Sequence, residues 1–91
     1  METDSIVKPP ESRKLKSGRV RLHPGEDIGE HVTEEREELL IVLKGTATLL
    51  KGDETIILDE GQTHFVPEGV KHDVKNNSAS ELEYIYVVSL F

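Results

Sequence analysis

Two short stretches of the sequence hold the side chains that could do chemistry. One runs from residue 25 to 45, and the other, from 60 to 76, reads EGQTHFVPEGVKHDVKN. Their notable polar residues are, in chain order, His31, Thr33, Glu38, His64 and His72. Imidazole and carboxylate groups are ligands for iron, zinc, nickel and manganese, whereas a neutral threonine hydroxyl is a poor one. No serine–histidine–aspartate order, phosphate-binding loop or HExxH pattern accompanies them, so the sequence names no dedicated nucleophile.

The spacing of both stretches resembles the two signature motifs of the cupin superfamily, from about Gly18 to the C-terminus. The defined positions of the second motif are all matched, by Gly61, Pro67, Gly69, His72 and Asn76. Those of the first are matched by Gly25, His31, Glu38 and Gly45. Thr33 is the exception, since metal-binding cupins have a second histidine at that position. The resemblance implies an all-β fold, a double-stranded β-helix or jelly-roll barrel.

The resemblance also implies a metal site formed by His31, Glu38 and His72. Two imidazoles and one carboxylate would leave coordination positions open on a divalent transition metal, with iron, manganese, nickel and zinc all compatible. Three functions fit these residues. The chain is a metal-binding cupin that acts on or binds a small molecule, a metal-free cupin that binds a small sugar or organic acid, or an interaction module. Thr33 favours the second.

The elements that position these residues read as short strands. From Ser17 onward, apolar runs alternate with turn signals such as Pro24-Gly25, Gly52-Asp53 and Glu60-Gly61, which is typical of an all-β sandwich or barrel. Residues 1–16 are polar and contain a proline pair, so we expect an N-terminal arm ahead of a single barrel domain over residues 17–91.

Residues 33–45, TEEREELLIVLKG, offer both helix and strand signals. Thr33 and the acidic residues after it could start a helix that ends at Gly45. The unbroken run from Leu39 to Leu43 lacks helical spacing, so a strand after an acidic EEREE loop fits better. Alternation then puts Glu38 on one face with Leu40 and Val42, and the apolar residues 39, 41 and 43 on the other. Both faces of this strand therefore need cover.

Further residues are predicted to line a cavity. Tyr84 and Tyr86 share a face of the last strand with Leu82 and Val88, which indicates core or pocket lining. Thr33 shares a face with His31, and His64 either faces the cavity or lies on the outside of its strand, exposed to solvent or to a partner. Arg19 and Arg21 also share a face, where they could bind an anionic group or simply be solvated.

The amino-acid composition limits the classes of partner that the chain can bind. The chain has 91 residues, a net charge of −7 and no cysteine, which excludes disulfides and thiolate metal sites and argues against nucleic acid and anionic membranes as partners. No apolar run is long enough for a membrane span or a signal-peptide core, so we expect a cytoplasmic protein. A small core with an apolar second face on residues 39–43 predicts a homodimer.

Overall fold

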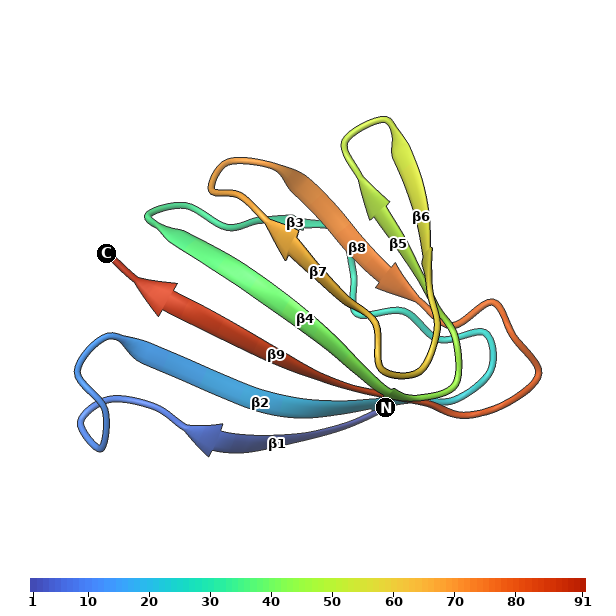
Figure 1. Cartoon of the computed structure of the whole chain (residues 1–91), viewed down its shortest axis with the longest axis horizontal. Coiled ribbons are helices and arrows are strands. Elements are labelled where there is room, and N and C mark those ends of the chain that lie inside the picture. Colours follow the sequence, from blue (N-terminus) through green and yellow to red (C-terminus); the bar gives the residue numbers. More distant parts are fainter.

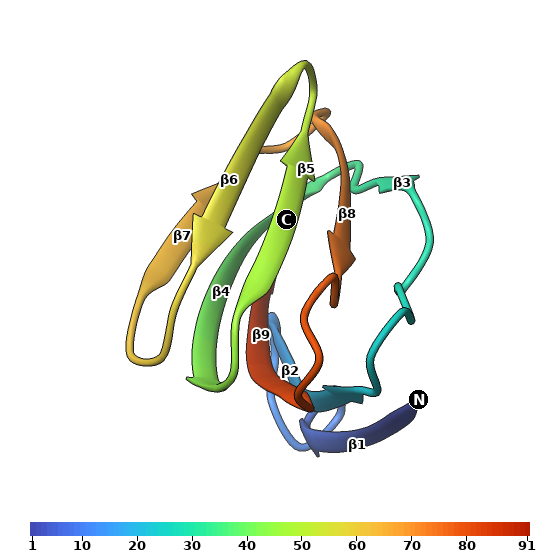
Figure 2. The same cartoon turned by 90° about the vertical axis from the view of Figure 1, so that its right-hand side faces the viewer.

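Nine β-strands form two facing antiparallel sheets in the computed structural model, which describes residues 1–91 and contains no helix. A five-stranded sheet has the order β1-β2-β9-β4-β7, and a four-stranded sheet has the order β3-β8-β5-β6 (Figure 1). The strands are β1 (Glu2–Val7), β2 (Leu15–Leu22), β3 (His31–Val32), β4 (Arg36–Lys44), β5 (Ala47–Lys51), β6 (Glu54–Leu58), β7 (Thr63–Val66), β8 (Lys71–Lys75) and β9 (Leu82–Leu90). The side view in Figure 2 separates the layer of β5 and β8 from that of β4 and β9. The expected all-β fold is confirmed.

The registers of the five-stranded sheet decide which side chains face the other sheet. Across β2, β9 and β4, Gly18 pairs with Tyr86, and Tyr86 with Leu40. The neighbouring row holds Lys16, Val88 and Glu38. Since Leu40 is only 3% exposed, these rows lie on the inner face. In the four-stranded sheet, His31 on β3 lies directly opposite His72 on β8, and Lys51 on β5 is the next residue across.

The core lies between the two inner faces. Its buried members are Val20, Leu22, Leu40, Val42, Ala47, Leu49, Leu58, Val66, Val74, Leu82 and Tyr84. They come from both sheets, and three of them, Val20, Leu40 and Tyr84, extend to the cavity beside Glu38. Asn76 is fully buried, and its side-chain amide donates to the carbonyls of Leu22 and Ser80 at 2.9 and 2.8 Å. This amide fixes the loop between β8 and β9 against β2.

The expected strand over residues 39–43 is confirmed, and it excludes the helix alternative. Leu40 and Val42 are buried, whereas Leu39 and Leu43 are 37% and 41% exposed, as the alternation predicts. The strand begins earlier than expected, because Arg36 already belongs to β4 and not to an acidic loop.

The N-terminal residues form part of the sheet. Residues 2–7 of the expected arm form β1, which pairs with β2 and has a bulge between Ser5 and Val7, and β2 itself begins at Leu15. β1 therefore extends the five-stranded sheet at the edge that lies beside the cavity. None of the elements is a helix that could cross a membrane.

Candidate metal centre and binding pocket

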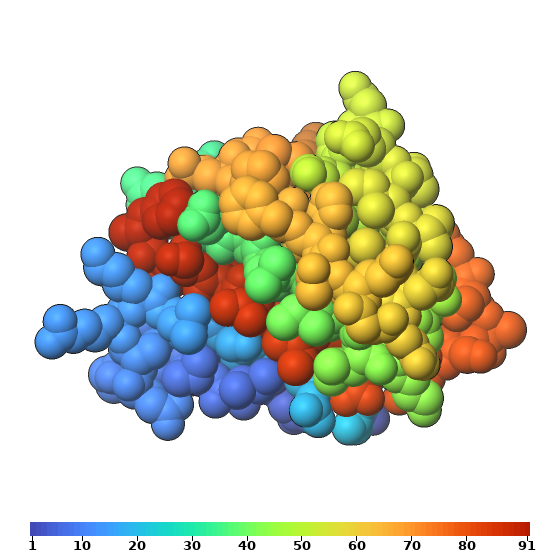
Figure 3. All heavy atoms as spheres, in the orientation of Figure 1, coloured from blue at the N-terminus to red at the C-terminus, as the bar shows by residue number.

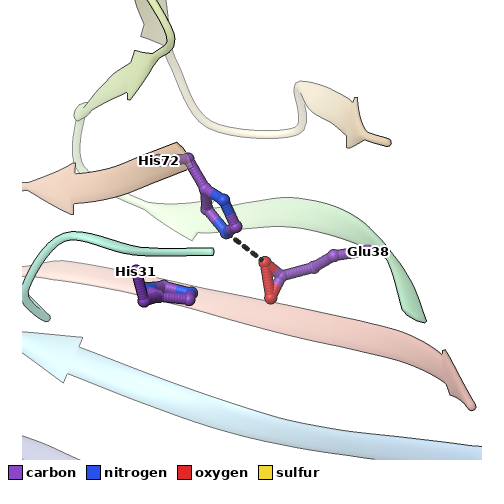
Figure 4. A group of neighbouring side chains, drawn as sticks. All are labelled: His31, Glu38 and His72. Carbon is purple, nitrogen blue, oxygen red and sulfur yellow. Dashed lines mark hydrogen bonds and ion pairs between the residues drawn. The ribbon is translucent and has the colours of Figure 1, made fainter. Parts of the chain in front are cut away.

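Three side chains from three strands converge at one end of the barrel. His31 comes from β3, Glu38 from β4 and His72 from β8, and they point toward one another in Figure 4. One ligand atom from each lies within 4.8 Å of those of the other two. The two imidazole rings are 4.2 Å apart between centroids, as expected for directly opposed residues on paired strands. The structure thus brings together the three residues that the motif resemblance singled out.

Backbone carbonyls orient both histidines. Nδ1 of His31 lies 3.0 Å from the carbonyl oxygen of Gly29, and Nδ1 of His72 lies 2.9 Å from that of Val70. A carbonyl can only accept, so each Nδ1 must carry the proton and donate it. Nε2 of each ring is then the nitrogen without a backbone partner, and it is the one available to a cation. Metal-ligating histidines are held in this way, with the second ring nitrogen donating to a backbone carbonyl or a carboxylate.

His72 and Glu38 make the closest contact in the group, with 3.1 Å between Nε2 and Oε2. They are 1% and 8% exposed, so this is a buried pair. Because Nδ1 already donates to Val70, the contact with the carboxylate needs a second proton on Nε2 or a cation shared by both atoms. Burial by itself lowers the pKa of His72, but the Glu38 carboxylate and the Val70 carbonyl outweigh it and raise the pKa above 6.5. The pair therefore favours a positive charge, either a proton or another cation, between Nε2 of His72 and Oε2 of Glu38.

A pocket opens beside this group between the two sheets. Its volume is about 320 Å³, at the lower end of the range for small-molecule sites. The polar and charged lining residues are Thr3, Lys16, His31, Thr33, Arg36, Glu38, Tyr84 and Tyr86, and the apolar ones are Met1, Val20, Ile28, Leu40 and Val88. Thr3 of β1 and Met1 just before it form part of its wall. The pocket is therefore mixed in character and reaches from His31 and Glu38, with His72 buried behind them, to the N-terminal edge of the sheet.

Thr33 and both tyrosines line this pocket. Thr33 lies just beyond β3, where its carbonyl accepts from the amide of Gly69 at 2.9 Å. That bond ties the Pro67–Gly69 turn to the end of β3. Tyr84 is 2% exposed, and burial, helped by the nearby Glu38 carboxylate, raises the pKa of its phenol. Its hydroxyl therefore stays protonated and can donate a hydrogen bond to a molecule in the pocket.

His64 is oriented inward but does not join the pocket. It pairs with Leu40 across β7 and β4, which places it on the inner face. Its Nε2 lies 3.2 Å from the ammonium group of Lys51. Burial and the ammonium of Lys51 lower the pKa of His64, so it is a neutral acceptor for Lys51. His64 thus connects β7 to β5 through its contact with Lys51. It belongs neither to the group of His31, Glu38 and His72 nor to the pocket lining.

Two charged pocket residues were missed by the sequence analysis, Lys16 and Arg36. Arg36 sits two positions before Glu38 on β4, so strand alternation places both on the inner face. Lys16 is likewise two positions before Gly18 on β2. This two-residue spacing could have predicted that both side chains face inward. For Arg36 it was obscured, because the surrounding glutamates were interpreted as a loop.

Comparison with known proteins agrees with this architecture. Residues 18–88 match the family described as Cupin domain. A mannose-1-phosphate guanylyltransferase of Salmonella montevideo is 38% identical over 71 residues, which are 78% of this chain and 15% of that protein. An oxalate-binding protein of Thermotoga maritima is 26% identical over 72 residues, or 79% of this chain and 60% of that protein. The crystal structure of TT1209 from Thermus thermophilus superposes with a TM-score of 0.90 at 27% identity, covering 99% of this chain and 83% of that one. The chain thus spans only part of the length of each relative.

Proposed function

This chain belongs to the cupin family, and from that premise we propose that His31, Glu38 and His72 bind a divalent transition metal beside a pocket for a small molecule. The single observation that carries the proposal is the convergence of one ligand atom from each of the three side chains within 4.8 Å, with each histidine Nδ1 engaged by a backbone carbonyl. Iron, manganese, nickel and zinc all accept this set of ligands.

The spacing of the closest pair supports the proposal. Two ligands that occupy adjacent positions at about 2.1 Å from one metal lie about 3 Å apart. The separation of 3.1 Å between Nε2 of His72 and Oε2 of Glu38 has this size. The raised pKa of His72 has the same origin, since the site attracts a positive charge, and a metal and a proton compete for it. His31 is exposed at the mouth and completes the set from the third strand.

The surrounding residues define what the site offers a ligand. A bound metal would supply Lewis-acid polarisation of a ligand oxygen. Thr33 leaves one side of the site to water or to the ligand, because its hydroxyl is a weak donor to a metal. The protonated Tyr84 can donate to a ligand atom, while Val20, Leu40 and Val88 exclude water from its apolar part. No side chain in the pocket is an evident nucleophile, so the proposal is limited to binding or metal-assisted chemistry.

Isothermal titration of the protein with Zn²⁺ or Mn²⁺ tests the proposal. His72→Ala should abolish metal uptake, and Thr33→His should tighten it by adding a further imidazole at the mouth. His23→Ala, which removes an exposed histidine away from the pocket, is the matched control and should bind as the unmodified chain does. Equal metal affinity in all four proteins would contradict the proposal.

A metal-free cupin that binds a small sugar or organic acid is the second candidate. Thr33 favours it, and so does the composition of the pocket, which has two tyrosines and two cationic side chains. The similarity to an oxalate-binding protein supports an organic acid in particular. Under this alternative, His72 and Glu38 remain a protonated pair that holds β8 against β4. A protein that takes up no metal but binds a small molecule in the same pocket would establish it.

We also propose a homodimer, formed through the outer face of the five-stranded sheet. Figure 3 shows this face, with β1 and β2 in blue, β9 in red, β4 in green and β7 in orange. Its contiguous apolar residues are Leu39, Ile41, Leu43, Phe65, Ile85 and Val87. Phe65 is 49% exposed, although it lies beside Leu39 on the paired strand. A second copy related by a two-fold axis can cover this patch with the same patch, which a small core favours.

A further inference from the structure

Two cationic side chains enter the pocket without a counter-ion. Lys16 on β2 and Arg36 on β4 both line the cavity, and neither has a carboxylate within 4.0 Å of its charged nitrogens. The chain has 18 acidic and 11 basic side chains, so partners are not scarce. Glu38 is the one carboxylate in the lining, and it is engaged with His72. The positive charge of this wall is therefore left uncompensated.

On the outer face of the same sheet, the cationic side chains of β2 do have carboxylate partners. Arg19 and Arg21 alternate with Lys16 along β2 and face outward. Both guanidinium groups lie within 4.0 Å of the Glu83 carboxylate, and that of Arg21 also contacts Glu2. These two arginines, which the sequence analysis considered for anion binding, are thus neutralised by protein carboxylates. Lys16 and Arg36, on the inner face, have no such carboxylate partner.

The sheet geometry sets the distance between these cations and the metal group. Arg36 is two residues from Glu38 on one strand, so their backbones are about 7 Å apart. Lys16 is two strands away, with Val88 between them in the same row, which corresponds to about 10 Å. A molecule of a few carbon atoms spans this gap, and Val88 and Leu40 provide an apolar floor for it.

We propose that the pocket selects a small ligand with an anionic group, a carboxylate or a phosphate, and holds that group on Lys16 and Arg36 while the rest of the ligand faces the three converging side chains. The inference deepens the proposed function, because it names the ligand class of the same pocket. A guanidinium and an ammonium are the groups that proteins use to bind such anions. The anionic end depends on Lys16 and Arg36 and not on a metal.

Amide-shift titrations by NMR on metal-free protein test this. The probes are malonate, its uncharged analogue malonamide, and inorganic phosphate. Malonate or phosphate should bind saturably and shift amides around Lys16 and Arg36, and malonamide should not. Arg36→Gln and Lys16→Gln should each weaken anion binding by about tenfold, the usual effect of losing one charged hydrogen bond. Arg19→Gln, on the outer face of the same sheet, is the matched control and should leave binding unchanged.

The same titration of His72→Ala separates this inference from the metal proposal. Anion binding that survives His72→Ala but is lost in Arg36→Gln supports the inference whether or not a metal binds. A preference for malonate over phosphate indicates a carboxylate ligand, and the reverse preference a phosphorylated one. The inference is wrong if malonamide binds as well as malonate, or if only His72→Ala reduces binding.

Discussion

Gly18→Ala should change the pocket and the stability together, because the ring of Tyr86 lies directly against Gly18. A Cβ atom at residue 18 would be 2.5, 2.7 and 2.8 Å from Oη, Cζ and Cε1 of Tyr86. Ordinary contacts between such atoms are about 3.5–4.0 Å, so the ring must move by about 1 Å. Overpacking of this kind costs about 1–3 kcal/mol, and the half-buried ring can swing toward the cavity, which favours the lower part of that range.

Thermal unfolding followed by circular dichroism measures the effect. For a domain of this size, a loss of about 1–2 kcal/mol lowers Tm by about 5–15 °C. Tyr86→Leu removes the ring atoms that clash, so the double variant Gly18→Ala/Tyr86→Leu should be more stable than the sum of the two single effects predicts. A coupling of about 1 kcal/mol is expected for residues in direct contact. If the two effects simply add, Tyr86 does not rest on Gly18 and the described shape of the pocket is wrong.

Three further predictions concern the turn, the buried pair and the outer face. Gly69 has a φ of +79° with open space around its Cβ position, so Gly69→Val should cost about 1–3 kcal/mol in chemical denaturation through backbone strain alone; an unchanged midpoint would contradict that conformation. The raised pKa of His72 stabilises the metal-free fold below pH 6.5, and this contribution is lost as pH rises through the folded-state pKa. The Tm difference between the metal-free protein and His72→Asn should therefore shrink as pH rises over that window, and a difference that grows would refute the assignment. Leu39→Lys, in the apolar patch, should give monomers in light scattering where the unmodified chain gives dimers; a monomeric unmodified chain would exclude the proposed assembly.

The sequence predicted those features that local pattern controls. Glu38 could be assigned to the inner face because a strict two-residue alternation with Leu40 and Val42 leaves it no other side. His31 and His72 were singled out through motif spacing, and the structure pairs them directly across β3 and β8. Turn positions such as Gly69 were readable because few residues tolerate their backbone conformation.

Features that depend on pairing between distant segments could not be predicted from the sequence. β1 has exposed residues on both faces, so its sequence ETDSIV shows no alternation and its place is set by backbone hydrogen bonds to β2. The direction of His64 follows from the register of β7 on β4, which its own neighbours do not reveal. Arg36 shows a related limit, because a run of acidic neighbours obscured the start of β4.

Anomalous diffraction tests the proposed metal site directly. The data would be collected at the zinc absorption edge from a crystal soaked in Zn²⁺. We expect one strong peak in the pocket, about 2.0–2.2 Å from Nε2 of His31, Nε2 of His72 and a carboxylate oxygen of Glu38. A matching crystal of His72→Ala should lack the peak. The metal proposal fails if the unmodified chain shows no peak there, or if the metal lies instead on the Nδ1 atoms or on carboxylates outside the pocket.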